Sequence, residues 1–277
     1  MGHPPGRLAL LHPFPSLLDG ALVSVLFVVA GGATGPALLL GVGMTAFQVS
    51  IGALNDLVDA AADAVVKPWK PIPAGQVSRD AAVIVVILGG LLGLFASAWF
   101  APLVALIGLA GYGCGVAYDV RLKRIGLGWL PFVAAFPLLL VYPWMAATGE
   151  LPPRSMALLP IAALAGPMLH LANTLVDREE DEATGVSTVA VRLGRRRGLW
   201  LLGLLVGAVY GVAWASLVLG DNVPSAAVTV SVLATLLAMV GVGLSTRAPR
   251  RSRAWGWSLQ AVGIALLGIG WLAAAAA

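Results

Sequence analysis

Long apolar runs constrain this chain more than any other feature of its sequence. Nearly all of nine such runs approach or exceed the about 18–20 residues that an α-helix needs to cross a hydrocarbon core of about 30 Å. They cover residues 16–32, 36–57, 80–99, 101–118, 127–147, 155–176, 199–219, 225–246 and 254–274. The runs are continuous, whereas membrane β-strands alternate polar and apolar residues. The sequence therefore predicts an all-α polytopic membrane protein with nine transmembrane helices.

The composition places the chain outside the range of ordinary soluble domains. Hydrophobic residues make up 59% and charged residues 11% of its 277 residues, and the mean hydropathy is +0.93. A soluble domain contains about 45–50% apolar and about 25% charged residues. No long linker separates the apolar runs, so we expect a single domain over residues 1–277, embedded in a lipid bilayer.

The basic residues predict how the chain is oriented in the membrane. Sixteen of the seventeen Lys and Arg residues lie in the N-terminus and in the loops 58–80, 119–126, 177–198 and 247–253. The loops on the opposite side of the membrane contain one basic residue, Arg154. Cytoplasmic loops are enriched in Lys and Arg, so we expect a cytoplasmic N-terminus and an external C-terminus, in a bacterial cytoplasmic membrane. The distribution argues against nucleic-acid binding. One group of arginines is expected at the lipid headgroups: Arg195, Arg196, Arg197, Arg250 and Arg251.

An acidic motif occurs twice, each time at the predicted cytoplasmic end of an apolar run. The first copy runs from Asn55 to Asp63 and the second from Asn173 to Asp181, and a shift of 118 residues superimposes them. The last two aspartates of each copy are four residues apart, so they share one face of a helix. Two equivalent copies on the same side predict a parallel internal repeat, with the motif helices facing a central cavity.

The two motifs bring at least six carboxylates to one membrane face, where like charge is costly unless cations neutralise it. Carboxylates and substrate phosphates are the ligands that Mg²⁺ prefers. We therefore expect two Mg²⁺ ions, one per motif, that bind a diphosphate and neutralise a leaving group. The predicted metal ligands are Asp59, Asp63, Asp177, Asp181 and Asn55; Asp56 joins the four aspartates as a predicted catalytic residue. Two solvated acidic loops are the alternative.

A diphosphate also needs positive ligands, and the loops beside the motifs supply them. Lys67, Lys70, Arg121 and Lys123 are the preferred phosphate ligands, although each could serve only to set the topology. The wider predicted substrate-binding set adds Asn55, Tyr118, Asn173, Arg192 and His170. His170 lies three residues before Asn173 and is expected to face an acceptor in the cavity or to pack in the core; His12 carries less weight.

These residues resemble the signatures of the UbiA-type intramembrane prenyltransferases. Asn55 to Asp63 fits the family's Asn-Asp-x-x-Asp-x-x-x-Asp motif, the segment 70–75 is similar to its basic-Pro-x-x-x-Gly segment, and Asp177 to Asp181 fits its second motif. The resemblance implies nine helices around a central cavity, two Mg²⁺ ions and a cap of cytoplasmic loops. It also implies that a prenyl diphosphate ionises and alkylates an acceptor, usually aromatic. Many members have Tyr-x-x-x-Lys after the fourth helix; here Lys123 comes one residue later and Asp119 intervenes.

The expected partners are thus a prenyl diphosphate and a lipophilic acceptor, with no obligatory protein partner. Three alternatives remain open at this point. Within the superfamily, the chain could transfer phosphoribose to a polyprenyl phosphate, or cyclise the prenyl chain with no acceptor. A cyclase would need aromatic cavity walls, and five aromatic residues cluster in the sequence: Trp129, Phe132, Phe136, Tyr142 and Trp144. From another class, a transporter of an anionic substrate would place its polar residues near the bilayer midplane.

Overall fold

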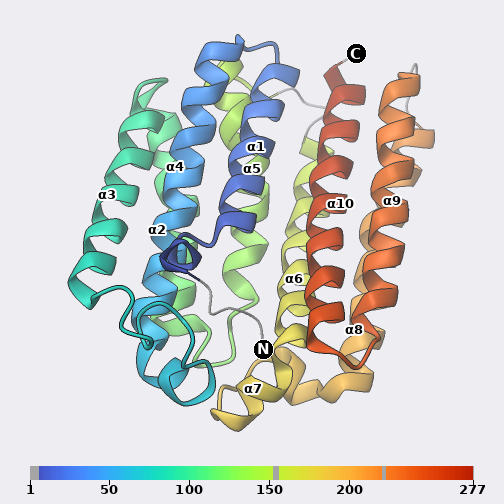
Figure 1. The fold of residues 1–277 in the computed structure, drawn as a ribbon. Coiled ribbons are helices and arrows are strands. Elements are labelled where there is room, and N and C mark those ends of the chain that lie inside the picture. Colours follow the sequence, from blue (N-terminus) through green and yellow to red (C-terminus); the bar gives the residue numbers. More distant parts are fainter. Residues whose placement is uncertain (1–5, 152–155, 220–222, 277) are drawn as a thin grey trace.

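The computed structural model describes residues 6–151, 156–219 and 223–276, and within these ranges the regular structure is helical throughout (Figure 1). The ten α-helices are α1 (Pro13–Val29), α2 (Thr34–Val66), α3 (Arg79–Ala98), α4 (Pro102–Ala117), α5 (Leu130–Thr148), α6 (Leu158–Val176), α7 (Arg178–Ala183), α8 (Val189–Val218), α9 (Ser225–Ser245) and α10 (Arg250–Ala276). A 3-10 helix η1 (Arg7–Leu11) precedes α1, and a π-helical turn η2 (Tyr118–Leu122) follows α4.

Nine of these helices, all except the six-residue α7, coincide with the nine predicted apolar runs. Eight are long and apolar enough to cross a membrane, with α4 counted together with η2 as far as Leu122, and α1 is shorter at 17 residues. The largest difference is at the end of α2, which continues to Val66 although its apolar run was predicted to end at 57. The extension is rich in alanine, the strongest helix former, so it needs no membrane to remain helical. The prediction of an all-α multi-pass membrane protein is confirmed.

The two halves of the chain repeat the same pattern of neighbours. In the first half α1 packs on α2, α2 on α3 and α3 on α4; in the second half α5 packs on α6, α6 on α8 and α8 on α9. The motif helices α2 and α6 therefore take equivalent places, as the shift of 118 residues predicted. Helix α10 packs on α9 and also contacts α1 and α6, so it joins the two halves. The loops that follow α2, α4, α6 and α9 all lie at one end of the bundle (Figure 1).

Small residues allow several of these helices to approach closely. A Cβ added to Gly89 on α3 would come within 2.7 Å of the carbonyl oxygen of Ala46 on α2, and one added to Gly93 would clash with Phe47. Such contacts drive helix association in lipid, where the hydrophobic effect is absent. By contrast, the glycines 203, 207 and 211 on α8 have no described atom of another element within 4 Å of an added Cβ.

Candidate active site

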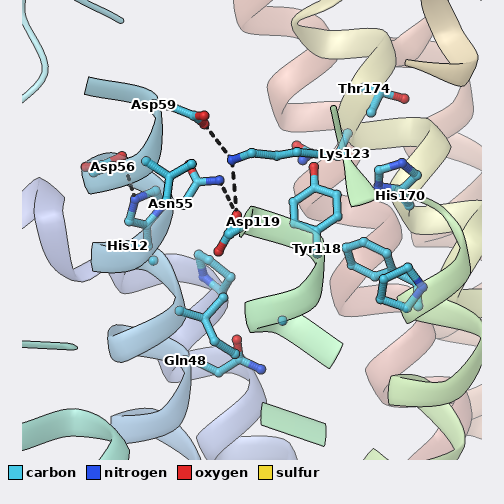
Figure 2. Close-up of a pocket in the computed structure, with 18 of the residues that line it drawn as sticks. His12, Gln48, Asn55, Asp56, Asp59, Tyr118, Asp119, Lys123, His170 and Thr174 are labelled. Carbon is cyan, nitrogen blue, oxygen red and sulfur yellow. Dashed lines mark hydrogen bonds and ion pairs between the residues drawn. The ribbon is translucent and has the colours of Figure 1, made fainter. Parts of the chain in front are cut away.

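A cavity of about 1010 Å³ lies between the two halves and opens at the end of the bundle where the acidic motifs lie. Helices α1, α2, α4, α5, α6 and α10 and the loops beside the motifs line it. The part inside the bundle is mainly apolar, with Met44, Phe47, Ile107, Phe136 and Leu139 among its walls. Charged side chains surround the other end (Figure 2). The cavity can therefore hold a molecule with an anionic or metal-binding head and an apolar tail.

The first acidic motif occupies the last turns of α2, and a lysine from the following loop neutralises two of its carboxylates. Lys70 Nζ lies 2.9 Å from Asp56 Oδ1 and 2.7 Å from Asp63 Oδ2. The side chains of Asp56 and Asp63 are only 3% and 8% exposed. The loop can turn back over the helix because prolines stiffen it and Gly75 adopts a φ of 68°, which favours glycine. His12 Nε2 also approaches Asp56 Oδ1, at 3.3 Å.

The turn η2 and the residue that follows it bring a fourth carboxylate, Asp119, and a second lysine, Lys123, to this motif. Lys123 Nζ donates to Asp59 Oδ2 at 2.7 Å and to Asp119 Oδ1 at 3.2 Å, and Asn55 Nδ2 donates to Asp119 Oδ1 at 2.6 Å (Figure 2). Asp119 is fully buried. The residue that interrupted the family pattern is thus part of the site, where it links Asn55 to Lys123.

The π-helical geometry of η2 explains how the chain accommodates the extra residue before Lys123. The backbone N–H of Lys123 donates to the carbonyl of Tyr118 at 3.1 Å, a bond across five residues in place of the four of an α-helix. Lys123 therefore remains one turn from Tyr118, with Nζ 5.7 Å from the centre of its ring. In a π-turn, two residues that are five positions apart are one helical turn apart, as two residues four positions apart are in an α-helix.

The second acidic motif lies where α6 ends and α7 begins, and its partners come from distant parts of the chain. Lys67 Nζ contacts Asp177 Oδ2 at 2.9 Å and Glu180 Oε2 at 2.8 Å. Arg250 contacts the same two residues, at 2.5 and 3.1 Å. The prediction that Arg250 sits at the lipid headgroups is therefore wrong: α10 begins beside the motif, so its first side chain lines the cavity.

The two aspartates of the second motif differ in their electrostatic surroundings. Burial raises the pKa of Asp177, but Lys67 and Arg250 more than offset this and hold its pKa below the ordinary value. Burial and the charge of Asp177 together raise the pKa of Asp181 to about 7. In the described part of the chain no lysine or arginine lies within ion-pair distance of Asp181. This end of the cavity therefore carries negative charge that a further cation would stabilise.

The oxygen atoms at this end of the cavity suit divalent metal ions in number and in kind. Seven carboxylates line this end of the cavity, against four cations that pair with them. The carboxylates are Asp56, Asp59, Asp63, Asp119, Asp177, Glu180 and Asp181. Oxygen donors in such excess fit Mg²⁺. No three of the described acidic, histidine or cysteine side chains already converge as a metal cluster, because ammonium groups lie between the carboxylates. Metal ligation would require these lysines to move.

The other predicted substrate-binding residues divide into two groups. Asn173 and His170 line the cavity, and the His170 ring stacks on Phe132 at 4.8 Å and meets Tyr118 edge-on (Figure 2). Arg121 and Arg192 are exposed and outside the cavity lining. Arg192 instead donates to the Ser187 hydroxyl at 2.8 Å, so in this arrangement neither arginine reaches the carboxylates that line the cavity.

The five aromatic residues that a cyclase would need do not form one wall. Phe132 and Phe136 line the cavity. Tyr142 is buried elsewhere, where its hydroxyl lies 2.7 Å from Ser97 Oγ, and Trp144 packs in the core formed with α6 and α8. The carboxylates of the two acidic motifs and the lysines that pair with them lie at one end of the cavity, whereas a transporter was expected to place its polar residues near the middle of the bilayer.

The polar residues of the cavity that the sequence did not predict include Asp19, Gln48 and Arg250. The first two are single polar residues inside apolar runs, and their only signal was that a polar side chain in such a run is costly. Arg250 belongs to the basic loop 247–253, and its charge was therefore assigned to the lipid headgroups. No local pattern connected it with a motif 73 residues away.

Comparison with known proteins identifies the family. The family model described as the UbiA prenyltransferase family matches residues 18–260. The chain is 33% identical to a digeranylgeranylglyceryl phosphate synthase from Methanoregula boonei over 199 residues, 69% of this chain and 70% of that protein. It is 28% identical to a 4-hydroxybenzoate octaprenyltransferase from Vibrio atlanticus over 60% of this chain and 57% of that protein.

Solved structures show the same fold. A UbiA homologue from Archaeoglobus fulgidus bound to GPP and Mg²⁺ superimposes with a TM-score of 0.74 over 97% of this chain and 99% of its own, at 16% identity. The apo structure of a homologue from Aeropyrum pernix K1 gives 0.75 over 92% and 96%, also at 16% identity. The family match covers most of the sequence, and the resemblance drawn from the two acidic motifs is confirmed. The chain belongs to the UbiA prenyltransferase family.

Proposed function

We propose that this protein is a Mg²⁺-dependent intramembrane prenyltransferase that ionises a prenyl diphosphate and transfers the prenyl group to a lipophilic acceptor. One observation carries the proposal: the two acidic motifs, 118 residues apart, meet at the charged end of a cavity whose interior is apolar. That arrangement matches a substrate with a diphosphate head and a hydrocarbon tail.

The carboxylates would hold two Mg²⁺ ions, with Asn55, Asp59 and Asp63 on one side and Asp177 and Asp181 on the other. Bound there, the metal would supply Lewis acidity toward the departing diphosphate. Lys67, Lys70 and Lys123 now neutralise the same carboxylates. With that charge neutralised by a bound divalent cation, the three ammonium groups would be free to donate charge-assisted hydrogen bonds to phosphate oxygens.

The interior of the cavity would hold the isoprenoid chain and shield the reaction from water. Tyr118 and His170 lie together near Lys123 (Figure 2). Phe132 contacts both, edge-on to Tyr118 at 5.3 Å and stacked on His170 at 4.8 Å. Aromatic faces attract cations, so Tyr118 and Phe132 are placed to stabilise an allylic cation as the diphosphate leaves. No nucleophilic side chain is required, because the acceptor supplies the electron pair.

The proposal also includes the domain organisation, the membrane orientation and the acceptor class expected from the sequence. Residues 1–277 would act as a single domain without an obligatory protein partner, with the acidic motifs on the cytoplasmic side of a bacterial membrane. The relatives' names mention glyceryl phosphate and 4-hydroxybenzoate. The acceptor is expected to be aromatic and quinone-precursor-like.

The test uses purified protein in detergent or nanodiscs, labelled prenyl diphosphates of several chain lengths, Mg²⁺ and a set of acceptors. The expected result is Mg²⁺-dependent release of pyrophosphate together with a prenylated acceptor. The control is the same mixture with a chelator. A cyclic hydrocarbon formed without any acceptor would show a cyclase instead, and absence of pyrophosphate release under all conditions would contradict the proposal.

A further inference from the structure

A second polar site lies inside the membrane-spanning part of the cavity, away from the acidic motifs. Asp19 on α1 and Gln48 on α2 both line the cavity, and Gln48 Nε2 donates to Asp19 Oδ2 at 2.6 Å. Gln48 precedes Asn55 by seven residues, about two helical turns or roughly 10 Å along α2. Figure 2 shows Gln48 on the far side of Asn55 and Asp119 from Asp59. The pair is therefore separate from the diphosphate end.

Packing of α1 against α2 does not account for this pair. The two helices already approach closely through glycines: a Cβ added to Gly20 would lie 2.8 Å from the carbonyl oxygen of Gly41. Ser24 reinforces the contact with a hydrogen bond to the carbonyl of Ala37. An aspartate within a membrane span is costly, and such residues usually serve a substrate or ion pathway. Asp19 has no ion-pair partner among the described lysines, arginines and histidines, and its recorded hydrogen-bond partner is a neutral amide.

The hydrogen-bonding capacity of the pair defines what it can bind. Gln48 uses one of its two N–H groups on Asp19, which leaves Asp19 Oδ1 and Gln48 Oε1 as acceptors against a single remaining N–H donor. The nearby Ser16 cannot add a donor, because its hydroxyl donates to the carbonyl of Leu11. The pair thus offers mainly acceptor oxygens, one of them on a carboxylate, to the cavity. It complements a hydroxyl or an ammonium group and repels a carboxylate or phosphate.

We propose that Asp19 and Gln48 bind a hydroxyl or amino group of the acceptor substrate, and that Asp19 selects against acceptors that carry an anionic group at that position. The inference rests on the proposed prenyltransferase function and specifies its second substrate. The prenyl diphosphate takes the cationic and metal-binding end, while the acceptor is held from the α1–α2 side. The two substrates are thereby separated by charge.

The test compares wild type with Asp19→Asn and Gln48→Leu. The matched control is Thr45→Val, which removes a hydroxyl from the same α1–α2 contact outside the cavity lining. One set of acceptors shares a phenol: 4-hydroxybenzyl alcohol, 4-hydroxybenzylamine and 4-hydroxybenzoate. A second set compares a monoalkylglycerol with its phosphate. Mg²⁺-dependent binding of a prenyl thiolodiphosphate is measured on each variant, so that the two substrates are assessed independently.

Wild type should use the neutral and amino acceptors with a KM at least about tenfold below that of the matched anionic acceptor, since desolvated like charges are strongly disfavoured. Asp19→Asn should raise the KM for the amine about tenfold and narrow the discrimination against 4-hydroxybenzoate, because the amide keeps an acceptor but loses the charge. Gln48→Leu should raise the KM for every acceptor. Thiolodiphosphate binding should stay within about twofold in all variants.

Unchanged acceptor KM values in both variants would overturn the inference, as would an equal loss of acceptor and thiolodiphosphate affinity, which would indicate a structural role. Use of none of these acceptors by a wild type that binds thiolodiphosphate normally would overturn the inference while leaving the prenyltransferase proposal in place. Failure of wild type to bind thiolodiphosphate with Mg²⁺ would instead refute the proposed function itself.

Discussion

The two copies of the acidic motif have the same spacing but different surroundings. The first lies on a continuous helix, and its inner carboxylates are nearly inaccessible and paired with Lys70 from the adjacent loop. The second lies at a helix break, is more exposed, and takes its cations from Lys67 and Arg250, 110 and 73 residues away. We infer that the first copy is fixed in place by its own helix and the adjacent loop. The second copy is complete only when the loop after α2, the break between α6 and α7, and the start of α10 come together.

The largest expected effect is loss of turnover when either copy is damaged. Asp59→Asn and Asp177→Asn should each lower kcat by more than about 100-fold, because each removes a predicted metal ligand where leaving-group charge develops. Steady-state assays at saturating Mg²⁺ measure this, with a melting curve to show that each variant is folded. Near-normal turnover in one variant would mean that only the other copy serves catalysis.

The comparison also predicts unequal stability losses in chelator. Lys70→Met removes the lysine that pairs with Asp56 and Asp63, whose side chains are 3% and 8% exposed. The substitution should therefore lower the free energy of unfolding by about 3 kcal/mol. Lys67→Met should cost only about 1 kcal/mol, because its partners are more exposed and keep Arg250. Denaturation in detergent measures both, and saturating Mg²⁺ should reduce the difference. Equal losses would remove the distinction between a fixed and an assembled copy.

A third prediction concerns diphosphate binding by the turn η2. Lys123→Ala should raise the dissociation constant of a prenyl diphosphate roughly 10- to 100-fold, as expected for a charge-assisted hydrogen bond of about 1.5–3 kcal/mol. Arg121→Ala should leave it unchanged, because Arg121 is exposed and outside the cavity. Binding of the corresponding prenyl alcohol is the control. The reverse result would show that the loop changes register when substrate binds.

The smallest effect is expected from shortening η2 by one residue. Deletion of Val120, which is 53% exposed, restores a spacing of four between Tyr118 and the lysine and should convert the π-turn to an α-turn. Lys123 would keep its position, so turnover should fall by no more than about fivefold, less than about 1 kcal/mol. A loss as large as that of Lys123→Ala would mean that the π-geometry itself is required.

Features with a local signal could be predicted from the sequence. The nine helices follow from the apolar runs, and the duplication follows from a motif whose two copies superimpose at one shift. Lys67, Lys70 and Lys123 were predicted at the site because they flank acidic turns on the same predicted side of the membrane, and all three line the cavity. The resemblance to the family was drawn from the two acidic motifs and the segment 70–75, and the family match confirms it.

Features that depend on packing between distant segments could not be predicted. Arg250 starts a helix whose register against α6 is set by the α9–α10 pair, and the sequence does not show that register. Asp19 and Gln48 become a pair only when α1 meets α2. Arg121 and Lys123 are two residues apart, so their roles depend on the turn geometry, which the sequence presented only as an irregular spacing.

The central claim is that the two motifs form one Mg²⁺-dependent diphosphate site, and a double-mutant cycle on substrate binding tests it most directly. Calorimetric titration of a prenyl thiolodiphosphate at saturating Mg²⁺ would be measured for wild type, Asp59→Asn, Asp177→Asn and the double variant. Residues of one site act as a unit, so we predict that each single variant loses most of the affinity and that the double variant is little worse than either. Strictly additive losses, or a single variant that binds like wild type, would show that the motifs act separately and would contradict the account.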